Sequence, residues 1–365
     1  MLSTAFTLAR RILTVLLSAA IASTALADEP RPQYSEHQDL SYSLNASGEK
    51  VAVRTPEDWK LRREHILAGM QTVMGPLPKP AQPVPLKMKV ISEQALDGCV
   101  RKLIAYHTDS AEREVRAYLF IPNGSEAKSR PAMLCLHQTT GIGKGEPAGI
   151  GGLVNLHYAL HLVQRGYVTL APDYPSFGDY PYAFPAENGY ISGTMKAIYD
   201  NIRAVDLLQS LDVVDGERIG VIGHSLGGHN SMFTAAFEPR LKVVVSSCGF
   251  TRFHKYYDGK LKGWTSPRYM PLINDRYENN ADKVPFDFPE IVASFAPRAF
   301  FASSPIGDSN FEVTGVRDTI AAAKPIYRLL GHEDHLEANY PDCGHDFPPE
   351  ARERAYRFID RHLKP

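Results

Sequence analysis

The stretch RIGVIGHSLGG, residues 218–228, decides the fold that we predict for this chain. Its first half is apolar, as expected for a buried strand, and its second half contains the pattern G-x-S-x-G with the serine at position 225. A serine at the tip of a strand-to-helix turn adopts strained backbone angles, and side chains two residues before or after it would collide, so glycine is required at 223 and 227. The stretch therefore predicts a strand, a nucleophilic serine and a helix. A glycine-rich turn with a solvent-facing serine is the alternative.

A nucleophilic serine needs a histidine as its base, and the histidine needs an acid that fixes its tautomer. If the chain order is serine, acid, histidine, both partners lie downstream of Ser225. His345, in the segment PDCGHDF after the last predicted strand, is the best placed of the 13 histidines; an ordinary loop histidine is the alternative. For the acid we choose Asp308, which follows the preceding predicted strand. Glu312 and Asp258 are the other candidates, and Asp308 would otherwise be a structural helix cap.

The same turn offers a site for the negative charge that develops during acyl transfer. The amides and the positive dipole end of the helix after Ser225 point to this place, so the backbone N–H of Leu226 is the first expected oxyanion donor. The second is expected from the loop after an upstream strand, where Thr139 or Gln138 would offer its backbone N–H. We interpret His137 in this loop as a packed or hydrogen-bonded anchor rather than a second base.

Short apolar runs alternate with helical segments from about residue 84 onward, which is typical of a mostly parallel sheet with helices on both faces. The predicted strands are residues 86–91, 99–106, 115–121, 132–136, 168–171, 219–222, 243–246, 299–302 and 336–340. The clearest predicted helices are residues 153–164, 194–211, 228–237, 316–330 and 350–362. An early antiparallel portion followed by β/α units predicts an α/β fold.

The first residues are interpreted as a secretory signal peptide. Arg10 and Arg11 precede an apolar stretch that ends in Ala-Leu-Ala at residues 25–27. A membrane anchor is the alternative, although the apolar stretch is short for crossing a bilayer. We therefore predict a signal peptide over residues 1–27, a mature protein that begins at Asp28, and a periplasmic or secreted location.

Two regions follow the signal peptide. Residues 28–85 form an N-terminal helical extension, because the segment TPED at 55–58 has the residue types of a helix start and a proline-rich connector follows the stop at Gly75. The catalytic domain is predicted over residues 86–365. It carries a cap-like insertion at about residues 250–297.

Composition excludes several classes of protein. The 40 Lys and Arg residues balance 41 Asp and Glu residues, so the chain has no general charge for binding nucleic acid, and no second apolar run approaches membrane length. The four cysteines form no CxxC pattern, and we pair none of them. His332 and His335 lie three residues apart without the HExxH spacing, so we expect no metal site.

Two insertions are rich in aromatic residues and are long enough to cover the serine. Tyr174 begins the first insertion, and Trp264 lies in the second. We expect both side chains to contact substrate, because aromatic faces match the C–H surfaces of sugars and their polar tips suit hydroxyl groups. The alternative is that these aromatic residues only pack the insertions onto the sheet.

The chain resembles the α/β-hydrolase superfamily from about Leu86 onward, and within it the branch of dienelactone hydrolases and acetylxylan esterases. The resemblance rests on Asp308 and on the segments LHQT at 136–139, LAPDY at 170–174, GHSLGG at 223–228 and CGHDF at 343–347. It implies the α/β-hydrolase fold and a serine esterase without a cofactor, and many exported relatives remove acyl groups from plant polysaccharides. The chain departs from the branch at Gln138, where relatives often have glycine, which leaves the second oxyanion donor open.

The residue after the nucleophile also departs from relatives. It is Leu226, where glucuronoyl esterases have arginine, so a methyl-glucuronate substrate is not favoured. Strict dienelactone hydrolases use cysteine where this chain has Ser225. Bulky neighbours of the serine and the absence of an amphipathic lid pattern predict short acyl groups.

The sequence therefore predicts an exported serine carboxylesterase that hydrolyses short-chain acyl esters through an acyl-enzyme, with acetyl groups on a carbohydrate as the expected substrate. A non-catalytic carbohydrate-binding member of the fold and a secreted serine peptidase are the alternatives. The peptidase of the prolyl-oligopeptidase type is disfavoured because the region before Leu86 is too short for a propeller. The expected partner is an acylated saccharide or another small ester, with no nucleic acid, and with no membrane after removal of the signal. The oligomeric state stays open.

Overall fold

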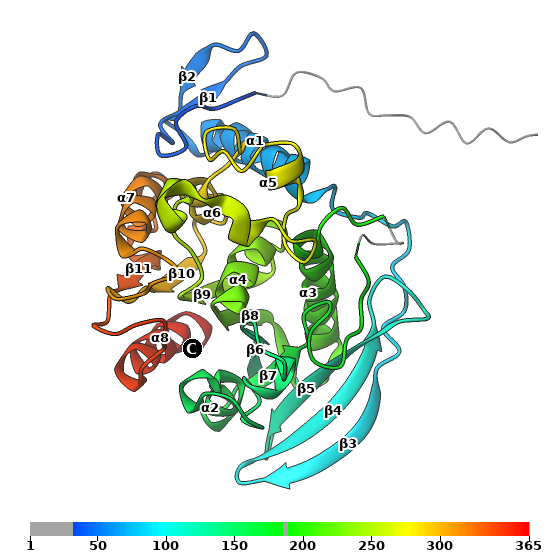
Figure 1. Cartoon of the computed structure of the whole chain (residues 1–365). Helices are drawn as coiled ribbons and strands as arrows, with labels where there is room; N and C mark the ends of the chain where they lie inside the picture. Colours follow the sequence, from blue (N-terminus) through cyan, green and yellow to red (C-terminus); the bar gives the residue numbers. More distant parts are fainter. Residues whose placement is uncertain (1–31, 185–188, 365) are drawn as a thin grey trace, which may run out of the picture. The chain divides into compact units, whose positions relative to one another are not determined.

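The structure is a computed structural model that describes residues 32–184 and 189–364 (Figure 1). The predicted signal peptide, residues 1–27, lies outside these described residues. Among the residues that are described, no helix has both the length and the apolar composition needed to cross a membrane. From Pro32 onward the chain forms one compact unit.

A nine-stranded sheet forms the centre of this unit, and the predicted α/β-hydrolase fold is confirmed. Its strands are β3 (Lys89–Leu96), β4 (Cys99–His107), β5 (Glu114–Pro122), β6 (Arg130–Leu136), β7 (Val168–Pro172), β8 (Val214–His224), β9 (Leu241–Ser247), β10 (Ala299–Ser303) and β11 (Leu336–Asn339). Their spatial order is β11-β10-β9-β8-β6-β7-β5-β4-β3. The six strands from β11 to β7 in this order are parallel, and β5, β4 and β3 are antiparallel. Each of the nine predicted strands therefore has a counterpart in the sheet.

Helices cover both faces of the sheet, as predicted. The long or sheet-covering helices are α2 (Tyr158–Gln164), α3 (Gly193–Ser210), α4 (Leu226–Phe237), α7 (Val313–Leu329) and α8 (Pro349–Leu363). α2 and α8 contact one face, whereas α3 and α4 contact the other, and the side chains of the two faces form separate buried clusters. Because β6 and β8 to β11 are parallel, the loops that follow them meet at one edge of the sheet.

Several predicted boundaries differ from the structure, for example the start of β8 at Val214 instead of Ile219, and two of the differences have a clear cause. The first strand begins at Lys89 instead of Leu86, because Lys87 adopts a positive φ of 43°, which interrupts an extended backbone. The helix predicted from Leu153 begins only at Tyr158 and is preceded by a separate 3₁₀ turn. Leu153 is 54% exposed, so the apolar residue that suggested an earlier start does not belong to the buried face of α2.

The N-terminal extension contains the predicted helix and also a small sheet that the sequence did not predict. α1 (Pro56–Met74) begins with a capping box between Thr55 and Asp58, as the residue types indicated. Before it, β1 (Tyr42–Leu44) and β2 (Lys50–Ala52) pair in antiparallel fashion, in a stretch where no strand was predicted. Strands of three residues carry too little alternation to be recognised. α1 contacts both this hairpin and the insertion helix α5 (Leu272–Asp275), as Figure 1 shows.

The insertion between β9 and β10 folds into short helical segments. These are the 3₁₀ segments η3 (Phe253–Gly259) and η4 (Leu261–Trp264) and the helices α5 (Leu272–Asp275) and α6 (Phe288–Ser294). α6 begins with a second capping box, between Asp287 and Glu290, and it contacts α1, α4 and α7. The insertion therefore packs against α1 of the extension and against α4 and α7.

Candidate active site

Ser225 lies at the turn between β8 and α4, and its backbone is in the left-handed region with a φ of 52°. A Cβ atom on Gly223 would lie 2.2 Å from the backbone of Gly227, and a Cβ atom on Gly227 would lie 1.9 Å from the carbonyl oxygen of Leu136. Neither position tolerates a side chain, which confirms the steric reason for the G-x-S-x-G spacing. The turn is fixed by a hydrogen bond of 2.8 Å from the Ser225 N–H to the carbonyl oxygen of Ser247.

His345 and Asp308 come together beside this turn. The Nδ1 atom of His345 lies 3.0 Å and 2.9 Å from the two carboxylate oxygens of Asp308, so it carries the proton and donates it to the carboxylate. Nε2 is then left as a bare acceptor. The Asp308 side chain is 1% exposed and that of His345 is 23% exposed, so the acid is shielded while the base remains accessible.

The pKa of Asp308 is lowered in this environment. Burial alone would raise it, but the hydrogen bond and charge of His345, with the backbone N–H groups of Asn310 and Phe311 at 2.8 Å and 3.2 Å, stabilise the carboxylate more. Asp308 is therefore ionised at neutral pH and can stabilise an imidazolium on His345.

The position of His345 relative to the serine follows from two aromatic contacts. Its ring centroid lies 4.9 Å from that of His224, the residue before Ser225, and 6.0 Å from that of Phe311, which lines a cavity together with Ser225. Burial and the neighbouring His345 lower the pKa of His224 to about 3, so His224 is neutral. The Ser225 hydroxyl makes no hydrogen bond to any residue in the described ranges. Such bonds often tighten only when substrate binds.

The two other acid candidates do not contact His345. Glu312 is the N-cap of α7 and accepts a hydrogen bond of 3.1 Å from the N–H of Thr314. Asp258 lies in the η3 segment of the insertion and has a positive φ of 56°. Among the described carboxylates, Asp308 alone bonds to His345.

The expected oxyanion donors lie at the same edge of the sheet. Leu226 is the first residue of α4, and Thr139 lines the cavity that contains Ser225. The side chain of Gln138 donates a hydrogen bond of 2.8 Å to Glu146, and its backbone N–H stays a candidate for the second donor beside that of Thr139. His137 is buried and accepts a hydrogen bond of 2.9 Å from the Tyr174 N–H, so it anchors this loop, as predicted.

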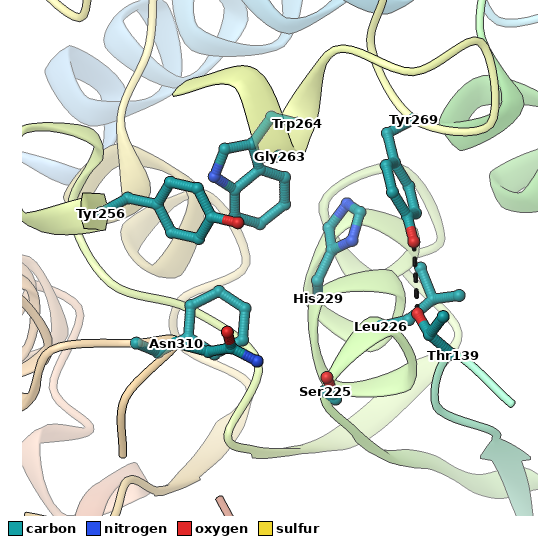
Figure 2. A pocket seen from close by; sticks show the side chains of 10 residues that line it. Thr139, Ser225, Leu226, His229, Tyr256, Gly263, Trp264, Tyr269 and Asn310 are labelled. Carbon is teal, nitrogen blue, oxygen red and sulfur yellow. Dashed lines mark hydrogen bonds between the residues drawn. The ribbon is translucent and has the colours of Figure 1, made fainter. Parts of the chain in front are cut away.

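A cavity of about 130 Å³ opens above the serine (Figure 2). Its lining residues come from α4, the loop after β6, the insertion and the loop after β10: Thr139, Ser225, Leu226, His229, Tyr256, Gly263, Trp264, Tyr269, Asn310 and Phe311. The hydroxyl groups of Tyr269 and Thr139 lie 3.2 Å apart and join the insertion to the loop after β6. None of the lining side chains bears a formal charge when His229 is neutral.

The two residues expected to contact substrate differ in placement. Trp264 lines the cavity, and its contact with substrate stays a prediction. Tyr174 does not line it: its ring belongs to a small buried cluster with Phe177 and Leu226, and its hydroxyl donates to the carbonyl oxygen of Arg268 at 2.6 Å. Tyr174 therefore supports the floor of the site and holds the insertion in place, and its expected contact with substrate is corrected.

Several lining residues were not named from the sequence, among them His229, Asn310 and Phe311. His229 follows Ser225 by four residues, a spacing that places both on one side of a helix, and this signal was available. Asn310 and Phe311 follow Asp308, and their backbone N–H groups donate hydrogen bonds to its carboxylate. Their side chains give no such signal, because the direction of a loop side chain is not encoded by spacing.

Two groups of side chains in the described ranges have the geometry to hold a metal ion. The first consists of His224, Cys248 and His345, beside the serine. The second consists of His332, Asp334 and His335, in the turn before β11 and so at the opposite end of the sheet. The expected absence of a metal stays a prediction. The four cysteines are unpaired, and Cys248 donates to the carbonyl oxygen of Asp346 at 3.3 Å.

Comparisons with known proteins agree with this architecture. The model of the prolyl oligopeptidase family matches residues 155–365, more than half of the chain. YtaP of Bacillus subtilis (strain 168) is 28% identical over 259 residues, which cover 68% of this chain and 83% of that protein. The glucuronoyl esterase from Solibacter usitatus superposes with a TM-score of 0.67 at 20% identity and covers 91% of this chain and 99% of that chain. The acetyl xylan esterase from Paenibacillus sp. R4 superposes with a TM-score of 0.56 at 20% identity, covering 90% and 99%.

Proposed function

The chain belongs to the prolyl oligopeptidase family of α/β hydrolases, and we propose that it is an exported serine carboxylesterase that removes short acyl groups, above all acetyl, from a carbohydrate. The esterase part of this proposal is carried by Ser225, which lines the cavity, and by the bonded pair of His345 and Asp308, because the His345 ring contacts His224 directly before the serine. The carbohydrate part is supported by the names of similar proteins, several of which are carbohydrate esterases.

The proposed reaction is acyl transfer in two steps. Nε2 of His345 takes the proton of the Ser225 hydroxyl as its oxygen attacks the ester carbonyl, and the N–H groups of Leu226 and Thr139 hold the oxyanion. Collapse of this intermediate breaks the bond to the alcohol, which leaves with the proton from His345. Water then gives a proton to His345 and attacks the acyl-serine. The bond between the acyl carbon and the serine oxygen breaks, and this oxygen takes the proton from His345, which releases the acid and restores Ser225.

The short acyl preference follows from the walls of the cavity. Leu226, His229, Trp264 and Phe311 are all buried, and they surround a space of about 130 Å³. A long acyl chain would have to displace packed side chains, and each methylene without room forfeits about 0.8 kcal/mol of burial, or roughly a fourfold loss in rate. Acetyl esters therefore match this site better than octanoyl esters.

The carbohydrate preference is supported by the polar atoms in the same cavity. Figure 2 shows the Tyr256 hydroxyl and the Asn310 amide directed toward the open space above Ser225, and the Trp264 ring forms part of the wall. Apolar aromatic walls with a few convergent polar tips suit a sugar, which has both C–H faces and hydroxyl groups.

Export is proposed from the sequence at residues 1–27, with a mature chain that begins at Asp28. N-terminal sequencing of the protein recovered from the periplasm or medium should find Asp28. An intact Met1 on the exported protein would contradict the cleavage. The division into an extension at 28–85 and a catalytic domain at 86–365 is part of the same proposal.

A substrate panel tests the function. We expect kcat/KM over p-nitrophenyl esters from two to twelve carbons to be highest at two carbons, with turnover of acetylated xylo-oligosaccharides. A maximum at eight carbons or beyond would contradict the short pocket. Faster cleavage of methyl glucuronate would indicate a glucuronoyl esterase. Faster cleavage of a prolyl p-nitroanilide would indicate a peptidase. Binding of xylo-oligosaccharides without turnover of any ester would favour a non-catalytic member of the fold.

A further inference from the structure

His229 is a buried titratable side chain that faces the cavity but has no role in the acyl transfer. It lies one helical turn after Ser225 in α4, lines the cavity and is 2% exposed. Its Nε2 atom is fully shielded and has no hydrogen-bond partner among the described residues. Buried polar atoms in native proteins normally have a partner, so an orphaned nitrogen at a substrate cavity requires an explanation.

The side chains around the imidazole contact its ring without giving Nε2 a hydrogen-bond partner. Its ring lies edge-to-face against Phe233 at 4.5 Å and against Trp264 at 5.0 Å, and the ring of Tyr269 is 6.4 Å away. Figure 2 shows His229 between Trp264 and Tyr269, on the same side of the cavity as Ser225. These rings pack around the imidazole, but neither the Trp264 indole N–H nor the Tyr269 hydroxyl forms a hydrogen bond with it among the described residues.

The same burial determines what the imidazole can bind. It lowers the pKa of His229 to about 3, so at neutral pH the ring is uncharged and has one N–H donor and one bare nitrogen acceptor. A carboxylate only accepts hydrogen bonds, and its charge would be buried in an uncharged cavity. A hydroxyl group both donates and accepts, so it can pair with either nitrogen of the ring.

We propose that His229 is the residue that recognises a hydroxyl group of the ester substrate, through a hydrogen bond between its imidazole and a sugar hydroxyl near the ester, for which the ring turns its shielded Nε2 atom toward the cavity. This inference rests on the proposed esterase function and makes its substrate class more specific: an acyl ester of a polyol or sugar. Recognition of this kind is selective, because an analogue without the hydroxyl leaves the buried nitrogen unpaired.

The test compares two acetate esters with rings of the same size. Methyl monoacetyl-xyloside carries free hydroxyl groups, and cyclohexyl acetate carries none. We expect His229→Phe, which keeps an aromatic ring in the aromatic cluster, to lower kcat/KM for the xyloside about 10- to 100-fold more than for cyclohexyl acetate. His229→Asn should recover part of the selectivity, because an amide can still bond a hydroxyl. His254→Asn, at an exposed insertion histidine bonded to Asp282, should leave both rates unchanged.

The outcomes separate recognition from packing and from failure of the esterase function. An equal loss on both esters, or no loss on either, would overturn the role of His229, and so would wild-type turnover of cyclohexyl acetate in preference to the xyloside. If the wild type hydrolyses neither ester, the proposed function fails, and the role of His229 is then tested by calorimetric measurement of saccharide binding. In that case a tenfold weaker binding of acetylated xylo-oligosaccharide after His229→Phe supports the proposal, whereas equal or absent binding overturns it.

Discussion

Two histidine–carboxylate pairs in this molecule have nearly the same local geometry. In the cavity region, Nδ1 of His345 lies 2.9 Å from Asp308, and in the N-terminal extension, Nδ1 of His37 lies 2.7 Å from Glu290. Both carboxylates are 1% exposed. The difference lies in what surrounds each pair. Glu290 also accepts a hydrogen bond of 2.6 Å from Arg62, which is fully buried.

The comparison shows that a buried histidine and an acid do not by themselves make an active site. Nε2 of His345 has no hydrogen-bond partner in the described part of the chain, and the residue lies at the edge of the sheet where a strained serine, helix amides and a cavity meet. His37 joins the segment before β1 to α6, and together with Arg62 it locks the extension onto the insertion. The first pair is available for proton transfer, and the second is a structural ion pair.

The largest expected effect is the loss of the nucleophile. Ser225→Ala should lower kcat on any ester on the order of 10⁴-fold or more, because the members of such a group act as a unit. A circular dichroism spectrum and melting temperature equal to the wild type would show that the fold is intact. Ester turnover near the wild-type level would show that Ser225 is not the nucleophile, so that the His345 pair would be no more catalytic than the His37 pair.

The next effect concerns the acids. Asp308→Asn should lower kcat on the order of 10³- to 10⁴-fold, because the amide favours the wrong tautomer of His345 and cannot stabilise its charged form. Glu312→Gln and Asp258→Asn are the matched controls, since neither carboxylate bonds to His345, and we expect each to change kcat less than about threefold. If either control variant loses more activity than Asp308→Asn, the acid has been placed on the wrong loop.

The sequence predicted the cavity region better than the extension for a physical reason. The strand, turn and helix around Ser225 are dictated locally, because Gly223 and Gly227 admit no side chain and the apolar runs are long. Asp308 and His345 could be placed because the loops after parallel strands meet at one edge. In the extension, Arg62 and His37 bond to Glu290, which lies 228 and 253 positions away in the chain. No local sequence pattern indicates partners at such distances.

The insertion was predictable in composition but not in detail. Its aromatic residues indicated a cover for the serine, and Trp264 has this role. The path of the chain was not predictable, because Tyr257 and Asp258 adopt positive φ angles in an aperiodic segment. For the same reason, Tyr174 was expected in the cavity but packs beneath Leu226.

The third prediction breaks the structural pair. Glu290→Gln leaves the guanidinium of Arg62 buried without its carboxylate, which should lower the free energy of unfolding by about 3–5 kcal/mol, measured by urea titration. Glu278→Gln is the matched control, because Glu278 pairs with Lys283 on the surface and its loss should cost less than about 1 kcal/mol. We expect kcat of the folded Glu290→Gln protein to stay close to the wild type. A large fall in kcat without loss of stability would mean that the two pairs are not functionally separate.

The smallest expected effect is a dependence of stability on pH that belongs to His37. Burial alone would lower the pKa of His37, but the charge and hydrogen bond of Glu290 and the charge of Asp287 outweigh burial and the repulsion by Arg62, so the pKa is raised above 6.5. Because the folded protein then binds this proton more tightly than the unfolded chain, the stabilisation is fully present below pH 6.5. It is lost as the pH rises through the higher folded value, by at most about 1.4 kcal/mol per pH unit for one proton. His37→Gln should remove this slope, so the stability difference between wild type and variant should shrink from pH 6 to pH 9. A difference that stays constant, or grows, over this range would show that His37 is neutral in the folded protein and that its pair with Glu290 is an ordinary hydrogen bond.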